Sequence, residues 1–290
     1  MKKALHISPN SYESIMSAGG TRKIWEELAK NYDEYHVLSR SRDLKYHIDK
    51  CDNIVLHTVP NVLKKTYPFF LTSYIYLLRE EHFDIVICQC SIFGGYSAVR
   101  LLKGKIPILM EIHGVFYFQI MKSKKFINRF LSKVIRYSLE NCTAIRSLNK
   151  DMTAELRNLG IQNRIVEVEN RVDLNLFTPP KDSQKISDEI KLISIGNFDE
   201  CKGHRYAFEA LKKLREKYNI SFMLISGGTL KHQYESIIKD YEINVKLVDR
   251  CSQEELKDYL RKSNIYIQTS KEEAMPRVIL EAMAMKLPVI

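Results

Sequence analysis

Two glutamates near the end of the chain, Glu273 and Glu281, stand eight positions apart on either side of Pro276. Proline fits the first turn of a helix, where its missing N–H costs nothing, so a helix is expected around this position. The unpaired N–H groups at such a helix start favour an anion, phosphate in particular. A carboxylate on each side could hold sugar hydroxyls through charge-assisted hydrogen bonds. This combination predicts a nucleotide-sugar site.

The segment from Ser270 to Ile290 also carries a family resemblance. The run Glu-Ala-Met-Pro-Arg-Val-Ile-Leu-Glu-Ala-Met-Ala and the later Leu-Pro-Val-Ile resemble the Glu-x7-Glu signature of retaining GT-B glycosyltransferases, often called glycosyltransferase family 4. The usual segment reads Glu-Gly-x-Pro, so Ala274 replaces a glycine. An ordinary capped amphipathic helix after a strand is the alternative explanation.

A second match lies upstream, where Gly196-Asn197 is followed by Lys202-Gly203. Family members commonly carry Gly-Arg or Gly-Asn and then Lys-Gly at this spacing. The resemblance implies that the lysine neutralises the donor pyrophosphate as charge builds on it in the transition state. A solvated loop lysine is the alternative. Asn197 offers only a neutral hydrogen bond where many relatives place an arginine, so phosphate binding would be weaker or would draw on another arginine.

The roles that the resemblance implies can be assigned residue by residue. Glu281 would hold the donor ribose and Glu273 the transferred sugar. The expected catalytic residues are His113, Lys202 and Glu273. The expected donor-binding residues are Gly20, Gly196, Asn197, Lys202, Asp249, Arg250, Met275, Pro276, Arg277, Val278 and Glu281. No Asp-x-Asp occurs in the sequence, so we expect neither a metal site nor a cofactor.

The elements that must position these residues follow from the hydrophobic pattern. Short apolar strands, among them 190–195 and 245–248, alternate along the chain with helices, which predicts parallel sheets covered on both faces. The predicted helices include 94–102 and one that starts at a capping box of Ser252 and Glu255 and reaches Arg261. Ligands bind beyond the carboxyl ends of such strands. The pattern thus predicts an α/β protein with Rossmann-like domains, and the resemblance implies the GT-B class, in which two such domains face a cleft. The predicted domains are 1–178, for the acceptor, and 179–290, for the donor, with a linker rich in proline and polar residues at 178–187.

Two features of the first half bear on the site. Gly19-Gly20 opens a predicted helix at 21–30, where backbone N–H groups could face a bound group, although a simple turn is equally compatible. His113-Gly114 closes a buried strand and resembles the family's active-site histidine position. A lone histidine at a strand end is otherwise structural. The resemblance favours His113 as a residue that lines the sugar site.

The most basic segment runs from Lys122 to Arg136. It predicts a helix at 124–140 with one apolar stripe, formed by Phe126, Ile127, Phe130, Leu131, Val134 and Ile135. The simplest interpretation is a surface helix whose apolar face packs on the sheet. A further hypothesis is that its basic face contacts anionic phospholipid and brings the enzyme to a lipid-linked acceptor.

Composition limits the other possibilities. The net charge of +10 is compatible with phosphorylated substrates, anionic lipid or a merely solvated basic surface, and no nucleic-acid-binding signature is present. No apolar run approaches a membrane span, and no secretory signal follows Met1. The six cysteines lack zinc or redox spacing, which favours reduced thiols. We expect a cytoplasmic protein with peripheral contact at the inner face of the cell membrane.

The chain ends at Ile290, within a predicted strand. Relatives continue with further strands, helices and a terminal helix, so the second domain is expected to be incomplete. The predicted function is retaining transfer of a sugar from a nucleoside-diphosphate sugar to an acceptor hydroxyl, in polysaccharide or glycolipid synthesis. The alternative is an inactive or fragmentary donor-binding subunit of a two-chain transferase. A GT-B epimerase is less favoured, and so is a phosphorylase, because the sequence has no pyridoxal-phosphate lysine motif.

Overall fold

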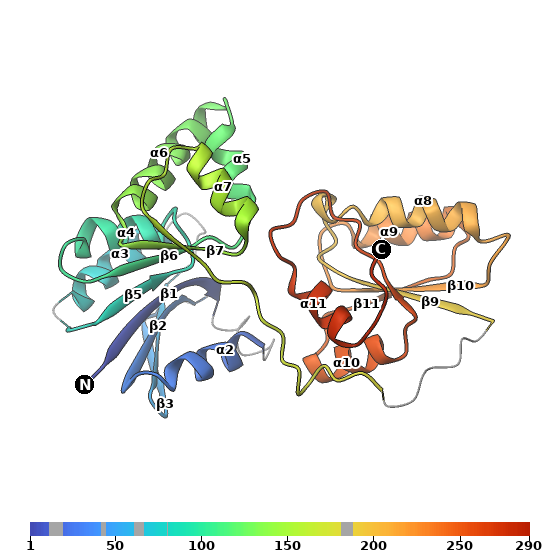
Figure 1. The fold of residues 1–290 in the computed structure, drawn as a ribbon, viewed down its shortest axis with the longest axis horizontal. Coiled ribbons are helices and arrows are strands. Elements are labelled where there is room, and N and C mark those ends of the chain that lie inside the picture. The colour runs from blue at the N-terminus through green and yellow to red at the C-terminus, as the bar shows by residue number, and fades with distance from the viewer. Residues whose placement is uncertain (12–19, 42–44, 61–66, 80, 181–187) are drawn as a thin grey trace. The chain divides into compact units, whose positions relative to one another are not determined.

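The computed structural model describes residues 1–11, 20–41, 45–60, 67–79, 81–180 and 188–290. The chain forms two compact units, Met1–Glu169 and Asn170–Ile290. The division falls before the predicted boundary at 178/179, because Leu176 and Phe177 are buried in the core of the second unit. Each unit is a sheet of mainly parallel strands with helices on both faces, and each is described on its own (Figure 1).

The first unit is built on an eight-stranded sheet in the order β3-β4-β2-β1-β5-β6-β7-β8. Its strands are β1 (Lys3–Ser11), β2 (Glu34–Arg40), β3 (His47–Cys51), β4 (Ile54–Val59), β5 (Ile85–Cys88), β6 (Ile108–Glu111), β7 (Ala144–Ser147) and β8 (Arg164–Glu167). All neighbours pair in parallel except β3, an antiparallel edge strand that pairs with β4. The sequence analysis did not predict β3, because its residues are mostly exposed and lack an apolar face.

Among the described residues, the helices that connect these strands are α2 (Gly20–Ala29), α3 (Tyr67–Leu78), α4 (Gly94–Leu102), α5 (Phe116–Lys122), α6 (Phe126–Asn141) and α7 (Lys150–Asn158). The predicted bounds of α4 are confirmed, and α5 was not predicted. Gly94 lets α4 approach the sheet closely, because a Cβ atom there would lie 2.6 Å from Ile7 Cγ2.

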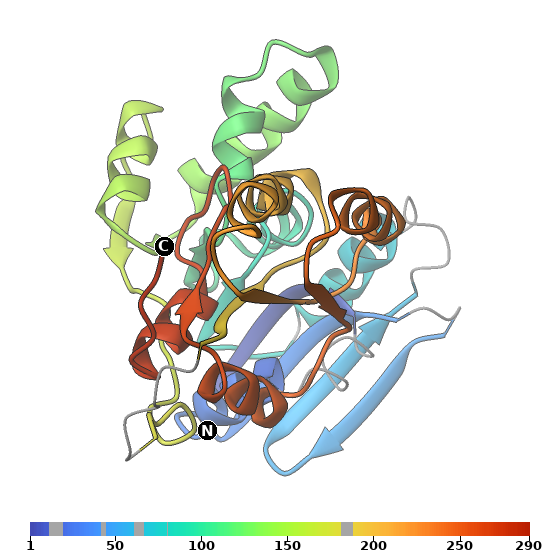
Figure 2. The same ribbon diagram turned by 90° about the vertical axis from the view of Figure 1, so that its right-hand side faces the viewer.

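The expectation that the whole apolar stripe of α6 packs on the sheet is wrong. Ile135 and Leu139, in the second half of the helix, are fully buried, but Phe126, Ile127 and Phe130 are exposed. The helix is longer than the surface it covers, so its first turns extend beyond the packed region. Both views show α5 and α6 side by side, with the turn between them pointing away from the sheet (Figures 1 and 2).

The second unit has a four-stranded parallel sheet in the order β11-β10-β9-β12. Its elements are β9 (Ile190–Ile195), the 3₁₀ turn η1 (Glu200–Lys202), α8 (His204–Leu214), β10 (Ile220–Ile225), α9 (Lys231–Tyr241), β11 (Val245–Val248), α10 (Gln253–Arg261), β12 (Ile265–Tyr266) and α11 (Arg277–Ala284). The predicted capping box of Ser252 and Glu255 starts α10. Near the end of the given sequence, Val289 forms an isolated parallel bridge with Tyr266 of β12.

Alternation along the strands divides the core of this unit between two faces. Phe222 and Leu224 of β10 pack with α8 and α9, whereas Ile225 and Ile193 pack with α10 and α11. Figure 1 shows these two helix pairs on opposite sides of the sheet. The arrangement leaves the carboxyl ends of β9 and β12 to carry the loops that are expected to bind a ligand.

A buried histidine network joins the central strands of the first unit. His36 Nδ1 lies 3.0 Å from His57 Nε2, and His57 Nδ1 lies 2.8 Å from the hydroxyl of Tyr74. His6 Nδ1 lies 2.5 Å from the hydroxyl of Tyr35. The pKa values of His6 and His57 are lowered to about 4, in both cases mainly by burial and for His57 also by the neighbouring His36. Both rings are therefore neutral in the folded protein at neutral pH.

This network predicts acid sensitivity of the first unit. In the unfolded chain both histidines protonate near pH 6.5, so between about pH 6.5 and 4 the unfolded state binds more protons. Stability is complete above this window and falls as the pH decreases through it, by about 3 kcal/mol per histidine. Trp25, the only tryptophan, is buried in this unit, so its fluorescence in urea titrations should report the loss.

A pair of variants separates this network from general acid effects. His57→Gln removes one of the two proton-binding sites and should flatten the dependence of stability on pH. His232→Gln is the control, because His232 is almost fully exposed. Identical pH dependence in His57→Gln and the unsubstituted protein would contradict the assignment.

Candidate functional site

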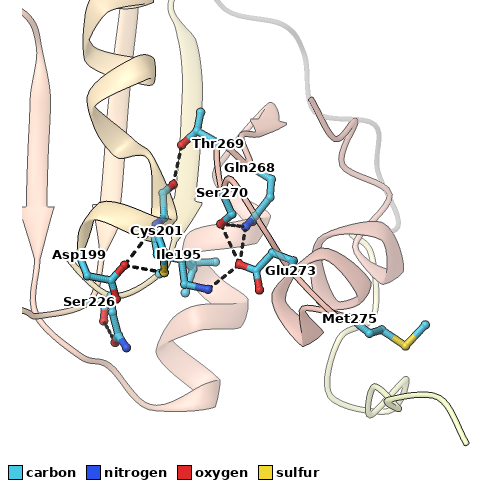
Figure 3. A network of polar contacts seen from close by, with 12 residues as sticks. Ile195, Asp199, Cys201, Ser226, Gln268, Thr269, Ser270, Glu273 and Met275 are labelled. Atoms are coloured by element: carbon cyan, nitrogen blue, oxygen red, sulfur yellow. Dashed lines mark hydrogen bonds and ion pairs between the residues drawn. The ribbon is translucent and has the colours of Figure 1, made fainter. Parts of the chain in front are cut away.

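Glu273 is the centre of a polar network in the second unit (Figure 3). Its Oε1 atom accepts hydrogen bonds from Ser270 Oγ at 2.7 Å and from Gln268 Nε2 at 3.2 Å. The same oxygen lies 2.5 Å from Lys202 Nζ. Three donors thus hold one carboxylate oxygen in place. The side chains of Lys202 and Glu273 are each 23% exposed, so a ligand in solution can reach both charges.

The sheet topology explains why these residues meet. Lys202 follows β9 and Glu273 follows β12, and the two strands are neighbours in the parallel sheet. Their carboxyl ends therefore lie at one edge, where loops of both strands converge. The sequence analysis singled out the lysine and the glutamate but missed Gln268 and Ser270. The polar run Gln268-Thr269-Ser270 directly after an apolar strand was the available signal.

Backbone contacts hold the two loops against each other. Thr269 Oγ1 donates to the carbonyl of Lys202 at 3.0 Å, and the Lys271 N–H donates to the carbonyl of Cys201 at 2.9 Å. Gly203 is required at this crossing, because its φ is +64° and a Cβ atom would lie 2.2 Å from the Thr269 carbonyl oxygen. The Lys-Gly pair is therefore explained locally: the glycine permits the close approach, and the lysine next to it points to Glu273.

Glu281 is the fifth residue of α11 and lies in its second turn rather than at its exposed start. The helix begins at Arg277, with Pro276 immediately before it in an extended conformation. The Glu281 side chain is buried, and among the described residues its Oε2 atom has no hydrogen-bond partner. Burial raises the pKa of this carboxyl, and the nearby charge of Arg277 only partly opposes the effect. A buried acceptor without a partner is costly unless a ligand supplies donors.

Gly196 and Asn197 form the turn that leads from β9 toward Lys202. His204 Nε2 lies 3.1 Å and 3.2 Å from their two carbonyl oxygens, so it must be the donor. Burial lowers the pKa of His204. The side-chain oxygen of Asn197 accepts a hydrogen bond from Ser226 Oγ at 3.3 Å. Gly196 also lies against the lysine stem, because a Cβ atom there would be 3.4 Å from Lys202 Cδ.

The remaining predicted donor residues fall into two groups. Met275, Pro276, Arg277 and Val278 surround the start of α11, where Asn170 Nδ2 donates to the Met275 carbonyl at 2.7 Å and anchors the loop. Asp249 and Arg250 follow β11, which is separated from β9 by β10, and both are exposed. Asp249 pairs with Lys231 Nζ at 2.7 Å. Within the described part of the chain, no hydrogen bond or ion pair joins Asp249 or Arg250 to Glu273.

The first unit contains a separate cluster around His113. The ring Nε2 donates to Glu111 Oε2 at 3.0 Å, and Arg146 Nη1 donates to Glu111 Oε1 at 2.8 Å. Burial alone would raise the pKa of Glu111, but the hydrogen bond from His113 and the charges of His6, His113 and Arg146 hold it at about 2. The carboxylate thus favours the tautomer of neutral His113 in which Nε2 carries the proton and Nδ1 is an acceptor.

Glu111 itself was missed by the sequence analysis, although period-2 alternation places it and His113 on the same side of the strand end. The other predicted residue of this unit, Gly20, is the first residue of α2. Gly19, its partner in the predicted Gly-Gly pair, lies outside the described residues.

No helix in the described residues is long and apolar enough to span a membrane. Within the same residues, no cluster of three potential metal ligands occurs.

Two family models together match most of the chain. The model described as Glycosyltransferase Family 4 matches residues 21–176, and the model described as Glycosyl transferases group 1 matches residues 178–290. An Escherichia coli UDP-Gal:alpha-D-GlcNAc-diphosphoundecaprenol alpha-1,3-galactosyltransferase is 25% identical over 76% of this chain and 60% of its own length. The part that the group 1 model matches includes Lys202 and both glutamates.

Solved structures support the fold. Sucrose-phosphate synthase from Thermosynechococcus elongatus superimposes with a TM-score of 0.82 at 17% identity, over 100% of this chain and 80% of its own. Anabaena HepE in complex with UDP-glucose gives a TM-score of 0.73 at 14% identity, with the same coverage. Both similarities show that the chain has the GT-B fold of two Rossmann-like domains, as predicted.

Proposed function

The chain belongs to Glycosyltransferase Family 4, and on that premise we propose that it transfers a sugar from a nucleoside-diphosphate sugar to an acceptor hydroxyl with retention of configuration. The proposal rests on the presence in the second unit of two carboxylates with different environments. Glu273 is held by Lys202 at the loop surface, whereas Glu281 is buried with an unpartnered oxygen. A donor sugar nucleotide supplies what both need: phosphates for the lysine and hydroxyl donors for the glutamates.

In the proposed complex Lys202 exchanges partners. Without ligand its ammonium is neutralised by Glu273 at 2.5 Å. A pyrophosphate carries more negative charge than one carboxylate and would attract the ammonium, which frees Glu273 to accept hydrogen bonds from sugar hydroxyls. Ser270 and Gln268 keep the glutamate oriented during this exchange. Glu281 would accept hydrogen bonds from the ribose. Asn197 and the N–H groups around Arg277 would complete the phosphate site.

We propose that transfer proceeds by same-face attack assisted by the leaving phosphate. The bond from the anomeric carbon to the phosphate oxygen breaks, and the acceptor oxygen bonds to the same face of that carbon. The acceptor's hydroxyl proton passes to the leaving phosphate, so atoms and charge balance without a metal ion. Lys202 stabilises the charge that develops on the phosphate. His113, with its tautomer fixed by Glu111, would contribute a hydrogen bond to the sugar.

The acceptor is proposed to be a glycan or a lipid-linked sugar, in polysaccharide or glycolipid synthesis. The similarity to a transferase that acts on a diphosphoundecaprenol-linked sugar supports this class of acceptor. A cytoplasmic location at the inner face of the cell membrane, with the basic segment from Lys122 to Arg136 toward anionic lipid, would bring the enzyme to such an acceptor.

A panel of UDP-, GDP- and ADP-sugars tests the proposed donor class. One nucleotide series should raise the melting temperature, because a ligand at a hundred times its dissociation constant stabilises the folded state by about 2.7 kcal/mol. Incubation of that donor with acceptor alcohols should release nucleoside diphosphate and give a glycoside with the donor's anomeric configuration by NMR. A folded protein that no nucleotide sugar stabilises would contradict donor binding, and an inverted product would contradict retention.

A further inference from the structure

The first turns of α6 expose three large apolar side chains. Phe126 is 89% exposed, Ile127 is 66% exposed and Phe130 is 64% exposed. Exposed apolar residues are ordinary when they are scattered, but these three are adjacent on one helix end. Phe126 and Phe130, four residues apart, lie in one row of the helix surface. This apolar end therefore faces water unless something outside the chain covers it.

Unpaired cations surround this apolar end. Lys122 pairs with Glu155 and Arg136 pairs with Glu140, but within the described residues no ion pair is formed by Lys124, Lys125, Arg129 or Lys133. The sequence contains no Asp or Glu from 112 to 139, so the positive charge has no acidic neighbour along the chain. We call the surface formed by these cations and the apolar end the α6 tip. It consists of Lys124, Lys125, Phe126, Ile127, Arg129, Phe130 and Lys133.

The α6 tip is held in place by hydrogen bonds in the turn between α5 and α6 and by the buried second half of α6. Asn128 Nδ2 donates to Ser123 Oγ at 2.9 Å, and the Lys125 N–H donates to the same oxygen at 3.3 Å, which ties the turn to the first helical turn. Further along the helix, Ile135 and Leu139 anchor it in the core. Because the tip is already ordered, little conformational entropy would be lost when it binds a surface.

We propose that the α6 tip inserts Phe126, Ile127 and Phe130 into the interfacial layer of an anionic bilayer, while its four cations bind the lipid headgroup phosphates. Large apolar side chains favour the headgroup and acyl boundary, and Lys and Arg beside them favour anionic lipid. The side-by-side placement of both chemistries fits a bilayer, which offers phosphate charge directly above hydrocarbon. This goes beyond an electrostatic contact of the basic face, because it assigns part of the affinity to insertion, and it does not depend on the transfer reaction.

Salt dependence distinguishes insertion from surface attraction. We would measure cosedimentation of the full chain with phosphatidylcholine vesicles and with vesicles that also contain phosphatidylglycerol, at low and at high salt. The protein should bind the anionic vesicles and retain part of this binding at high salt, because insertion is not screened. Phe126→Ser/Phe130→Ser should weaken binding at least about tenfold at either salt concentration and abolish the salt-resistant part.

Two further variants complete the comparison. Lys125→Gln/Arg129→Gln/Lys133→Gln should lower binding by about a hundredfold at low salt while leaving little salt dependence. Leu174→Ser/Tyr218→Ser is the matched control, because both side chains are exposed to a similar degree but lie outside the α6 tip. This control should bind as the unsubstituted protein does. All substituted side chains are exposed, so unchanged thermal unfolding is expected and should be verified.

A fluorescent probe tests insertion directly. Phe126→Trp adds one indole at the α6 tip, and Trp25, which is buried, contributes a constant background. Anionic vesicles should shift the emission to shorter wavelength, and brominated lipids should quench it. Unquenched emission with bound vesicles, equal binding to neutral and anionic vesicles, or full binding by Phe126→Ser/Phe130→Ser would each overturn the proposal. So would a dimer in solution that dissociates in that variant, because a second copy would then be the occupant of this surface.

Discussion

Lys202→Ala is expected to lower kcat/KM roughly 10²–10³-fold. The Lys202 ammonium sits 2.5 Å from Glu273 in the ligand-free protein and is proposed to move to the leaving pyrophosphate. Its charge would then act mainly where negative charge develops, so the loss should fall more on kcat than on KM. Steady-state kinetics with varied donor concentration measures both parameters.

Lys271→Ala is the matched control for this substitution. Lys271 belongs to the loop after β12, and its ammonium lies 5.7 Å from the ring of Tyr206 rather than at Glu273. Its backbone contact with Cys201 survives the substitution. The control should keep its activity within a small factor. Full turnover by Lys202→Ala, with saturable donor binding, would remove the lysine from the proposed mechanism.

Glu273→Gln is expected to reduce sugar transfer roughly 10–100-fold, the effect of losing a charge-assisted hydrogen bond of about 1.5–3 kcal/mol. The proposal places this carboxylate on the transferred sugar only. Lys202 loses its anionic partner in the variant and becomes freer to bind phosphate. Inhibition by the nucleoside diphosphate product should therefore be unchanged or stronger. Weaker product inhibition would show that Glu273 supports the nucleotide instead.

The sequence was sufficient for the features that follow from strong local patterns. The largely apolar segments of β9 and β11 were predicted with their observed bounds, and the capping box correctly predicted the start of α10, because a specific cap leaves few alternatives. The sequence also placed Lys202 and Glu273 each after a strand of one parallel sheet, although it did not predict their ion pair. The Lys-Gly pair and the glutamate spacing pointed to the residues before the topology was known.

Other features depend on tertiary distances that no local pattern contains. The apolar stripe of α6 is continuous in sequence, yet only its second half packs, because the length of the underlying surface decides which turns are covered. The ion pair between Lys202 and Glu273 was not predicted. The sequence analysis assigned the lysine to the donor pyrophosphate and the glutamate to the transferred sugar, so it gave no reason to expect contact between them. Equally, the different environments of the two glutamates arise from burial: Glu281 is enclosed, whereas Glu273 remains at the loop surface.

The burial of Glu281 also has a consequence for stability. A carboxyl whose pKa is raised in the folded state contributes stability at low pH, and this stability is lost as the pH rises through that pKa. At neutral pH the charged form is therefore unfavourable in the ligand-free protein. Glu281→Gln removes the charge at nearly constant shape and should not destabilise the fold. A ligand-binding defect in this variant would thus report on the site rather than on folding.

The most direct test of the central claim is calorimetric titration of Glu281→Gln and Glu273→Gln with the nucleoside diphosphate of the identified donor and with the intact sugar nucleotide. We expect Glu281→Gln to weaken both ligands by about 1–3 kcal/mol, because the ribose loses a buried acceptor. Glu273→Gln should bind the nucleoside diphosphate at least as tightly as the unsubstituted protein. Equal losses of nucleoside diphosphate in both variants, or no loss in either, would contradict a nucleotide-sugar site built on these two carboxylates.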